Sequence, residues 1–345
     1  TLQFDMKGFG NPGEFDLLID EDGNADYNDG THRLIKTGSL SGNNLSFSSI
    51  DIADGEVFTL IRKNPDAQII YESASWTGGN SAGVLDVSAI DLLKSVQIRE
   101  SVVLPTAANC KCMEVTSGAI VTVENGKNLT VTDVLELEGE MYLYGNAQLI
   151  QTLDGADLNT GSGSIYKIVQ DGTSSIHRFN YWGAPVSDDG SYNLASNLSI
   201  ASDPNDFSSL TTPSYTGGVD GATNTISSYW LYDFRNALGW NSINENTTKL
   251  KGEGFTMKGT GTATNYVFVG KPTNGDISLD LDENNYYLLG NPYPSTINAD
   301  DFNSYHLTND ITDGYLYFWD QPAGDSHYKA AYEGGYATRA GGMSS

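Results

Sequence analysis

The sequence predicts an all-β protein, and three observations lead to this prediction. Glycine (38 residues) and tyrosine (20 residues) each outnumber all lysines and arginines together (18). Glycine, asparagine and serine favour turns, and serine and asparagine also compete with the helical backbone for hydrogen bonds, so long helices are disfavoured. Many short segments alternate apolar and polar residues with period two, which is typical of half-buried strands.

The chain has 345 residues, enough for two or three domains at ~100–200 residues each. We expect a β-sandwich-like N-terminal domain, or the last part of one, over residues 1–64 and a connector over 65–100. A short β-solenoid or a stacked β-meander should follow over 101–175. A Tyr/Trp-rich β domain with long loops should occupy 176–345.

Residues 1–64 contain several short strand-like segments. Residues 14–20 and 45–52 alternate in the manner of half-buried strands, and 57–61 form an apolar run that should pair centrally. Turn-forming clusters separate them, which favours a β-sandwich. In the connector, residues 88–96 are the best helical candidate of the chain, at one or two turns.

The pattern is clearest over residues 101–170, where short alternating strands are broken by Gly or Asn-Gly. A single rung of this kind cannot bury its apolar face alone, so rungs must stack. A roll of hairpins is the alternative to a solenoid. In either case we expect the following side chains to point inward: Val121, Val123, Leu129, Val131, Leu135, Leu137 and Leu143.

The C-terminal region should contain aromatic strands separated by long polar segments. Residues 229–233, 286–289 and 315–319 are predicted strands, and 188–220 is a predicted polar loop. Loops this long are unusual in a compact domain unless they carry function or bind ions.

The charge excludes several functions. The formal net charge of −26 repels nucleic acid and anionic membrane surfaces. No apolar run approaches the ~20 residues that a membrane-spanning helix needs. We therefore expect no nucleic-acid partner and no membrane span, and an acidic surface suits external fluid. We also expect the chain to be a piece of a larger secreted protein.

Two cysteines, Cys110 and Cys112, are too few for a disulfide framework. In one strand both would point to the same face, as two small buried side chains. A strained local disulfide is the alternative.

A calcium loop is the sharpest local prediction. Carboxylate or amide oxygens recur at Asp20, Asp22, Asn24 and Asp26, and Asp29 follows at a distance that lets it complete the shell. Ca²⁺ takes six to eight oxygen ligands at ~2.3–2.6 Å, which a loop with ligands at alternate positions can supply. The spacing differs from that of an EF-hand, and a solvated acidic turn is the alternative.

Enzymatic motifs are weak, and we expect no enzymatic activity. The four histidines are isolated in sequence, and the chain has no nucleophile elbow and no phosphate-binding loop. His327 is expected to be a hydrogen-bonding residue rather than a base. Nothing in the sequence singles out a glycosidase pair of carboxylates.

The aromatic residues are the second candidate for a binding function. Tyrosine and tryptophan on β surfaces can stack on sugar rings, although most such residues pack in the core. The candidate glycan-binding residues are Trp182, Trp230, Trp240 and Trp319.

Several stretches resemble secreted surface proteins of gliding and other Bacteroidetes bacteria. The stretches that carry the resemblance extend from about residue 105 to the end of the chain: CKCMEVTSGAIVTVENGKNLTV (110–131), GNAQLIQ (145–151), YWGAPVS (181–187), GFTMKGTG (254–261), GKPTNGDI (270–277), LGNPYPS (289–295), LYFWDQ (316–321) and AYEGGYA (331–337). The resemblance implies an adhesin-like cargo of the type IX secretion system. It carries over no catalytic residues.

The leading hypothesis is therefore a calcium-stabilised structural or adhesive region of a secreted cell-surface protein. Its partners would be other cell-surface or extracellular components, including glycans, and the type IX secretion machinery during export. The alternative is a polysaccharide-binding module or a polysaccharide-acting enzyme, which would need two carboxylates ~5–9.5 Å apart in a cleft.

Overall fold

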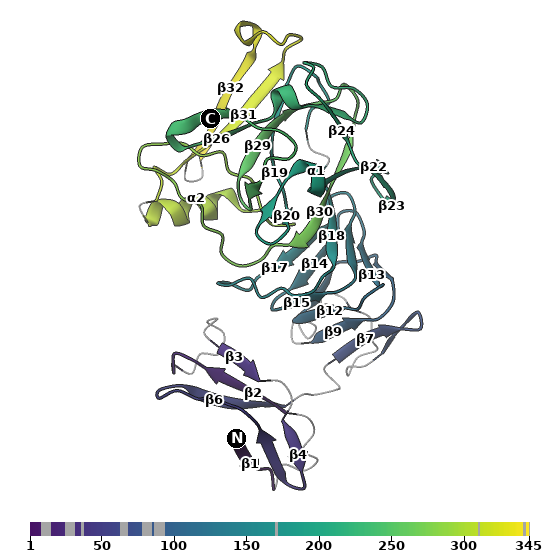
Figure 1. The fold of residues 1–345 in the computed structure, drawn as a ribbon, viewed down its shortest axis with the longest axis vertical. Helices are drawn as coiled ribbons and strands as arrows, with labels where there is room; N and C mark the ends of the chain where they lie inside the picture. Colours follow the sequence, from purple (N-terminus) through teal and green to yellow (C-terminus); the bar gives the residue numbers. More distant parts are fainter. Residues whose placement is uncertain are drawn as a thin grey trace.

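A computed structural model describes residues 1–7, 15–24, 32–35, 38–62, 68–77, 85, 94–169, 172–309, 311–340 and 343–344. The protein is nearly all β, with 47% of its residues in strands and 8% in helices. This confirms the predicted all-β class. Figure 1 shows the order of the three regions along the chain.

The N-terminal region contains two antiparallel sheets of three strands each. The strands, in sheet order, are β1 (Leu2–Asp5), β5 (Asn44–Phe47) and β4 (Ser39–Ser41) in one sheet, and β3 (His32–Ile35), β2 (Phe15–Asp20) and β6 (Val57–Arg62) in the other. Both sheets contribute to one apolar cluster, in which Leu17 and Ile19 of β2 lie with Leu45 and Phe47 of β5. These side chains alternate along their strands, as the period-two pattern predicted.

Three sheets of parallel strands then build a β-solenoid of about four turns. The first sheet contains β7 (Gln68–Glu72), β9 (Ser95–Ile98), β12 (Cys112–Val115) and β15 (Leu135–Leu137). The second sheet contains β10 (Val102–Leu104), β13 (Ile120–Val123), β16 (Glu140–Leu143) and β18 (Ser164–Val169). The third sheet contains β11 (Ala108–Cys110), β14 (Asn128–Val131) and β17 (Gln148–Gln151). Within each sheet these strands pair in parallel, which distinguishes the solenoid from a meander of antiparallel hairpins.

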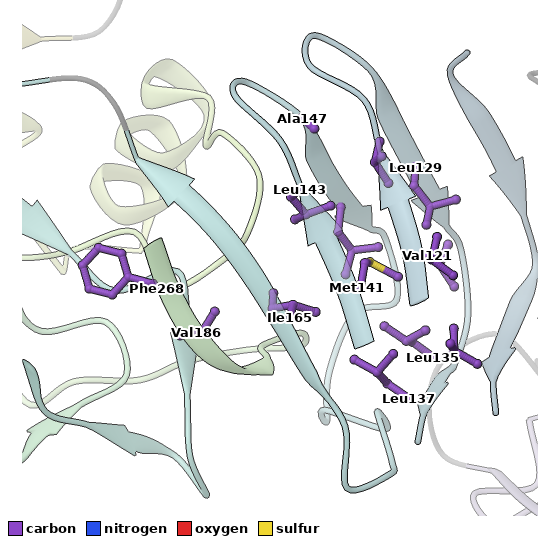
Figure 2. Close-up of a cluster of buried hydrophobic side chains, with 14 of the residues drawn as sticks. Val121, Leu129, Leu135, Leu137, Met141, Leu143, Ala147, Ile165, Val186 and Phe268 are labelled. Atoms are coloured by element: carbon purple, nitrogen blue, oxygen red, sulfur yellow. The ribbon is translucent and has the colours of Figure 1, made fainter. Parts of the chain in front are cut away.

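One turn of the solenoid takes about twenty residues. Val121 of β13 pairs with Met141 of β16, and Leu129 of β14 pairs with Leu149 of β17. All seven side chains that were predicted to point inward are at most 1% exposed. Figure 2 shows this core, in which side chains from the three sheets meet along the solenoid axis.

The solenoid extends N-terminally beyond the predicted boundary. Strands β7 and β9, from the region expected as a connector, belong to the first solenoid sheet, and β8 (Ser75–Thr77) pairs antiparallel with β7. The predicted helical stretch 88–96 lies mostly outside the described residues, and its last two residues begin β9.

A corner between two sheets separates the cysteines. Cys110 ends β11 and is buried, whereas Cys112 begins β12 and is partly exposed. The expectation of one strand with both side chains on one face was wrong, because the chain bends at Lys111. The Lys111 amide donates to the Lys94 carbonyl at 2.8 Å, which ties this corner to the preceding turn.

The C-terminal region continues directly from the second solenoid sheet. Strand β18 pairs in parallel with β16 on one side and antiparallel with β30 (Asn265–Pro272) on the other. Beyond β30, the sheet adds β22 (Leu198–Asp203) and β23 (Asp206–Thr211), and β20 (Val186–Ser187) also pairs with β30. The edge that β18 would expose is thereby covered, which protects it from pairing with other chains.

The remaining strands form smaller sheets in the C-terminal region. They are β19 (Phe179–Gly183), β29 (Gly254–Lys258), β26 (Tyr232–Arg235) and β27 (Gly239–Ser242) in a four-stranded sheet; the pairs β21 (Ser191–Tyr192) with β28 (Lys249–Leu250) and β24 (Ser214–Thr216) with β25 (Thr225–Ser227); and β31 (Tyr315–Ala323), β32 (Glu333–Ala340) and β33 (Met343–Ser344). The β31–β32 hairpin lies at one end of the molecule (Figure 1).

The helices of the described residues are short: α1 (Leu194–Asn197), α2 (Ala299–Thr308), and the 3-10 turns η3 (Ser228–Trp230), η4 (Asn236–Leu238) and η5 (Lys329–Ala331). Helix α2 was not predicted, although Asn298 caps it by accepting bonds from the amides of Asp300 and Asp301. In the part of the chain that the structure describes, no helix is long and apolar enough to cross a membrane.

Two predictions for the C-terminal region were wrong. Residues 188–220 are not one polar loop, because β21, α1, β22, β23 and β24 all lie within them. In β23 the polar residues Asp206, Ser208, Ser209 and Thr211 are exposed, while Phe207 is buried at 3% exposure. Residues 286–289 make isolated bridges only, through Tyr287 and Leu289.

Candidate functional site

The acidic loop after β2 contains a series of local side-chain-to-backbone bonds. The Asp20 carboxylate is fully buried, and its Oδ1 accepts a bond from the Asp22 amide at 3.3 Å. Asp22 in turn accepts from the Asn24 amide at 3.1 Å and from Asn24 Nδ2 at 2.9 Å. The other two predicted ligands, Asp26 and Asp29, lie outside the described residues. Among the residues that are described, no group of three His, Cys, Asp or Glu side chains is arranged to hold a metal.

The four candidate tryptophans lie in three different environments. Trp182 is 7% exposed and packs edge-on against Tyr266 in the main core. Trp230 packs against a buried lysine, and only Trp240 and Trp319 share a neighbouring ring, because both pack against Tyr181. The structure therefore supports a shared surface for two of the four.

We call Tyr181, Phe234, Trp240, Trp319 and Tyr336 the aromatic platform. Tyr181 of β19 lies parallel to Trp319 of β31, with ring centroids 6.3 Å apart and an interplanar angle of 10°. Trp240 of β27 meets Tyr181 edge-on at 5.9 Å and Phe234 of β26 at 5.1 Å. Tyr336 of β32 packs on Trp319 at 5.2 Å, so rings from five strands form one continuous group.

The aromatic platform is held in place and partly open to solvent. The hydroxyls of Tyr181 and Tyr336 are hydrogen-bonded at 2.9 Å, and burial together with this bond raises the pKa of Tyr181, which keeps the phenol neutral. Trp240 is 46% exposed and Tyr336 is 48% exposed. Exposed, pre-ordered aromatic groups are typical of surfaces that bind a ligand rather than of core.

The same surface continues along β31. Tyr315 and Tyr317 alternate with Trp319 on one face of the strand, and Tyr286 packs edge-on against Tyr317 at 5.7 Å. Tyr286, Tyr315 and Tyr317 are 61%, 50% and 41% exposed. The aromatic side chains therefore form a stripe rather than a single stacking site.

A second constellation surrounds Lys258 at the end of β29. This side chain is 2% exposed, and its Nζ lies 3.6 Å from the ring centre of Trp230, 4.6 Å from that of Phe179 and 5.0 Å from that of Tyr332. Nζ donates to the Tyr332 hydroxyl at 3.0 Å and lies 3.2 Å from His327 Nδ1. Burial lowers the pKa of Lys258 to about 8.

His327 links this lysine to an acid. Its Nε2 lies 2.7 Å from Asp220 Oδ1, so with Nε2 protonated, Nδ1 is free to accept a bond from Lys258. Trp230 stacks on the imidazole at 5.1 Å, and its Nε1 donates to the Val219 carbonyl. The expectation that His327 is a hydrogen-bonding residue agrees with these contacts. These contacts enclose the Lys258 ammonium group and fasten three segments of the chain together.

A buried ion network is the third constellation, and it joins β26 to β28. Asp233 and Glu253 are 0% and 1% exposed. Lys249 Nζ lies 2.7 Å from Asp233 Oδ2 and 3.5 Å from Glu253 Oε2, and Arg235 contacts the same two carboxylates. The Tyr287 hydroxyl donates to Glu253 Oε1 at 2.5 Å.

The Asp233–Glu253 pair has the wrong surroundings for glycoside hydrolysis. Burial alone would raise the pKa of Asp233, but Lys249 and Arg235 outweigh it and the pKa is lowered. A general acid needs a raised pKa and contact with the leaving oxygen, whereas both carboxylates here are enclosed and ion-paired. The network is thus structural, since removing one partner would leave a buried charge uncompensated.

The fold and these sites define a class of protein: a parallel β-solenoid joined through a shared sheet to a mainly antiparallel β region with an exposed aromatic stripe. The chain belongs to the family of DUF8693, a domain of unknown function, whose family model matches residues 75–341. The match extends from β8 to the end of β32, so it takes in the aromatic platform and all of the solenoid except its first strand, β7. No curated protein matches the chain, and no solved structure matches it.

Proposed function

We propose that the chain is an extracellular structural and adhesive region of a secreted cell-surface protein, and that it adheres to glycans through the aromatic platform. The single observation that carries this proposal is the partly exposed, pre-ordered group of Tyr181, Trp240, Trp319 and Tyr336 in the region that continues the solenoid sheet. Export through the type IX secretion system, in the manner of Bacteroidetes surface proteins, is the route implied by the sequence resemblance.

The chemistry of the aromatic platform favours a sugar as the ligand. A pyranose ring has an apolar face of C–H groups that packs on a flat aromatic ring, and its hydroxyls remain in water. The net charge of −26 disfavours polyanionic ligands, so the expected glycan is neutral or carries positive charge. Since the stripe continues to Tyr317 and Tyr315, an extended polysaccharide fits better than a single sugar unit.

The solenoid would serve as a stiff spacer between the N-terminal region and the adhesive surface. Its rungs are joined by parallel ladders and share one core, as in repeat proteins whose units contact only their neighbours. Calcium at the acidic loop of the N-terminal region would add stability there, with Asp20, Asp22 and Asn24 as ligands together with Asp26 and Asp29.

Binding to insoluble polysaccharides tests this proposal directly. The full chain is mixed with cellulose, chitin and insoluble mannan, and the bound fraction is measured over a range of protein concentrations. Trp240→Ala should weaken binding about tenfold, because a stacked ring contributes on the order of 1–3 kcal/mol. Tyr305→Ala, which removes a 64% exposed ring from α2, is the matched control. Equal binding by the wild type and Trp240→Ala would refute the proposed role of the platform.

A further inference from the structure

We propose that a second sugar-binding site lies at the junction of the solenoid and the C-terminal region, in a hollow that takes one sugar unit through its hydroxyl groups. The proposal rests on the proposed function in one respect, that the chain contacts glycans. The hollow has a volume of about 200 Å³ and is lined by residues from three segments, 149–154, 273–276 and 293–297. None of these residues belongs to the aromatic platform.

Hydrogen bonds hold the three segments together without a ligand. The Leu149 amide donates to the Pro294 carbonyl at 3.1 Å, which brings the third segment onto the end of β17. The Tyr293 hydroxyl donates to the Gly275 carbonyl at 2.7 Å, and Gln148 Oε1 accepts a bond from the Thr296 amide at 2.8 Å. The hollow is therefore formed in advance, which lowers the entropy cost of binding.

One polar side-chain group of the hollow lacks a hydrogen-bond partner of its own. Asn274 is 4% exposed and its Nδ2 is buried with no hydrogen-bond partner in the described structure. A buried donor without a partner costs about 1–3 kcal/mol, so a ligand that accepts its bond would recover that energy. Asp154 and Asp276 also line the hollow, and carboxylate oxygens accept hydrogen bonds.

A hydroxyl-bearing ligand satisfies both kinds of group. One hydroxyl of a sugar ring would accept from Asn274 Nδ2 and another would donate to Asp154 or Asp276, whereas a metal ion cannot accept a hydrogen bond from an amide. The side chains of Leu149 and Leu153 supply an apolar wall for the C–H groups of a ring. This combination of a few placed polar groups on an apolar wall is the usual composition of a small-molecule site.

The size of the hollow limits the ligand to one unit. A volume of 200 Å³ corresponds to about seven waters at ~30 Å³ each. Pockets that bind drug-sized ligands have volumes of roughly 300–1,000 Å³, so this smaller hollow fits a terminal or branching sugar unit rather than an internal stretch of polysaccharide.

The test is a titration of the full chain with single sugars, followed by saturation-transfer NMR. Glucose, galactose, mannose and N-acetylglucosamine are each titrated, and calcium chloride is titrated separately. At least one sugar should bind saturably to the wild type. Asp276→Asn should weaken that binding about tenfold, and Asp154→Asn should weaken it as well. Asp54→Asn, an exposed change in the N-terminal region, is the matched control and should bind as the wild type does.

Asn274→Asp separates a sugar site from a cation site. It replaces the buried donor with a third carboxylate, so sugar binding should be lost. Gained calcium affinity in this variant, with no sugar binding by the wild type, would overturn the proposal. Sugar binding that both Asp154→Asn and Asp276→Asn leave unchanged would also overturn it. The melting temperature of each variant is measured and compared with that of the wild type, to check that the variant is folded.

The proposed polysaccharide site on the aromatic platform and the proposed single-sugar site in the hollow can be refuted independently of each other. Trp240→Ala leaves the hollow intact, so it should bind the single sugar as the wild type does. Asp276→Asn leaves the aromatic platform intact and should still bind insoluble polysaccharide through it. If no single sugar binds the wild type, the hollow proposal is refuted while the polysaccharide assay still decides the proposed function.

Discussion

Replacing Lys258 with methionine should change how the stability of the protein depends on pH. The pKa of this buried lysine falls from 10.5 to about 8. Between these two values the unfolded chain binds a proton that the folded protein does not, so the free energy of unfolding rises with pH in this window. Below about pH 8 both states are protonated, and the burial of the ammonium costs about 3 kcal/mol at ~1.4 kcal/mol per pKa unit.

The Lys258→Met variant isolates the contribution of the buried ammonium group to the free energy of unfolding. From about pH 7 to about pH 9.5 the stability of the wild type relative to Lys258→Met should rise by about 2 kcal/mol. Methionine is suitable because its thioether packs favourably against aromatic rings, and here it would lie among Phe179, Trp230 and Tyr332. In Lys258→Met, His327 loses the hydrogen bond from Lys258 at both pH values. The cost of that lost bond therefore cancels when the stability differences at the two pH values are compared.

The measurement is denaturation by urea at the two pH values. Both pH values must stay below about pH 10, because burial raises the pKa of Tyr181 and Tyr192 in the folded protein. Above that pH these phenols ionise in the unfolded chain but not in the folded protein, which lowers the free energy of unfolding. Lys271→Met removes a surface lysine and serves as the matched control. If the stability of the wild type relative to Lys258→Met is the same at both pH values, the lysine is not desolvated as described and the account of its burial is wrong.

Two further predictions concern stability. Leu129→Ala, at a side chain that is 0% exposed in the solenoid core, should destabilise the protein by about 2–5 kcal/mol in urea denaturation, whereas Val103→Ala, at 53% exposure, should cost far less; equal effects would contradict the inward orientation of Leu129. Calcium should raise the first thermal transition of the full chain relative to EGTA, with about 2.7 kcal/mol gained at a hundredfold excess over Kd. Asp22→Ala should abolish that gain, and identical melting curves in both buffers would leave the loop a solvated acidic turn.

The solenoid core could be predicted from sequence because strand alternation is local. Val121 and Val123, or Leu135 and Leu137, are two residues apart and must share a face in any strand. The pairing could not be predicted the same way, because parallel rungs and antiparallel hairpins need the same alternation. The two arrangements differ in which residue pairs with which across the sheet. In the solenoid, Val121 pairs with Met141, which lies about twenty residues further along the chain.

The candidate sites were harder to predict because their members are distant in sequence. Tyr181 and Tyr336 are hydrogen-bonded across 155 positions, so no local pattern joins them. Lys258 gave no signal either, since a lysine in a strand is expected to face solvent. Its burial follows from rings contributed by Trp230 and Tyr332, which only the fold brings together.

Strand β18 fixes the geometry between the solenoid and the aromatic platform. Because β18 is hydrogen-bonded to β16 on one side and to β30 on the other, the two regions share one sheet and no flexible joint separates them at this point. Each rung adds one strand spacing, ~4.8 Å, along the solenoid axis. The number of rungs therefore sets the distance of the aromatic platform from the first rung in fixed steps, so a relative with one more turn of about twenty residues would hold its aromatic platform ~4.8 Å further out.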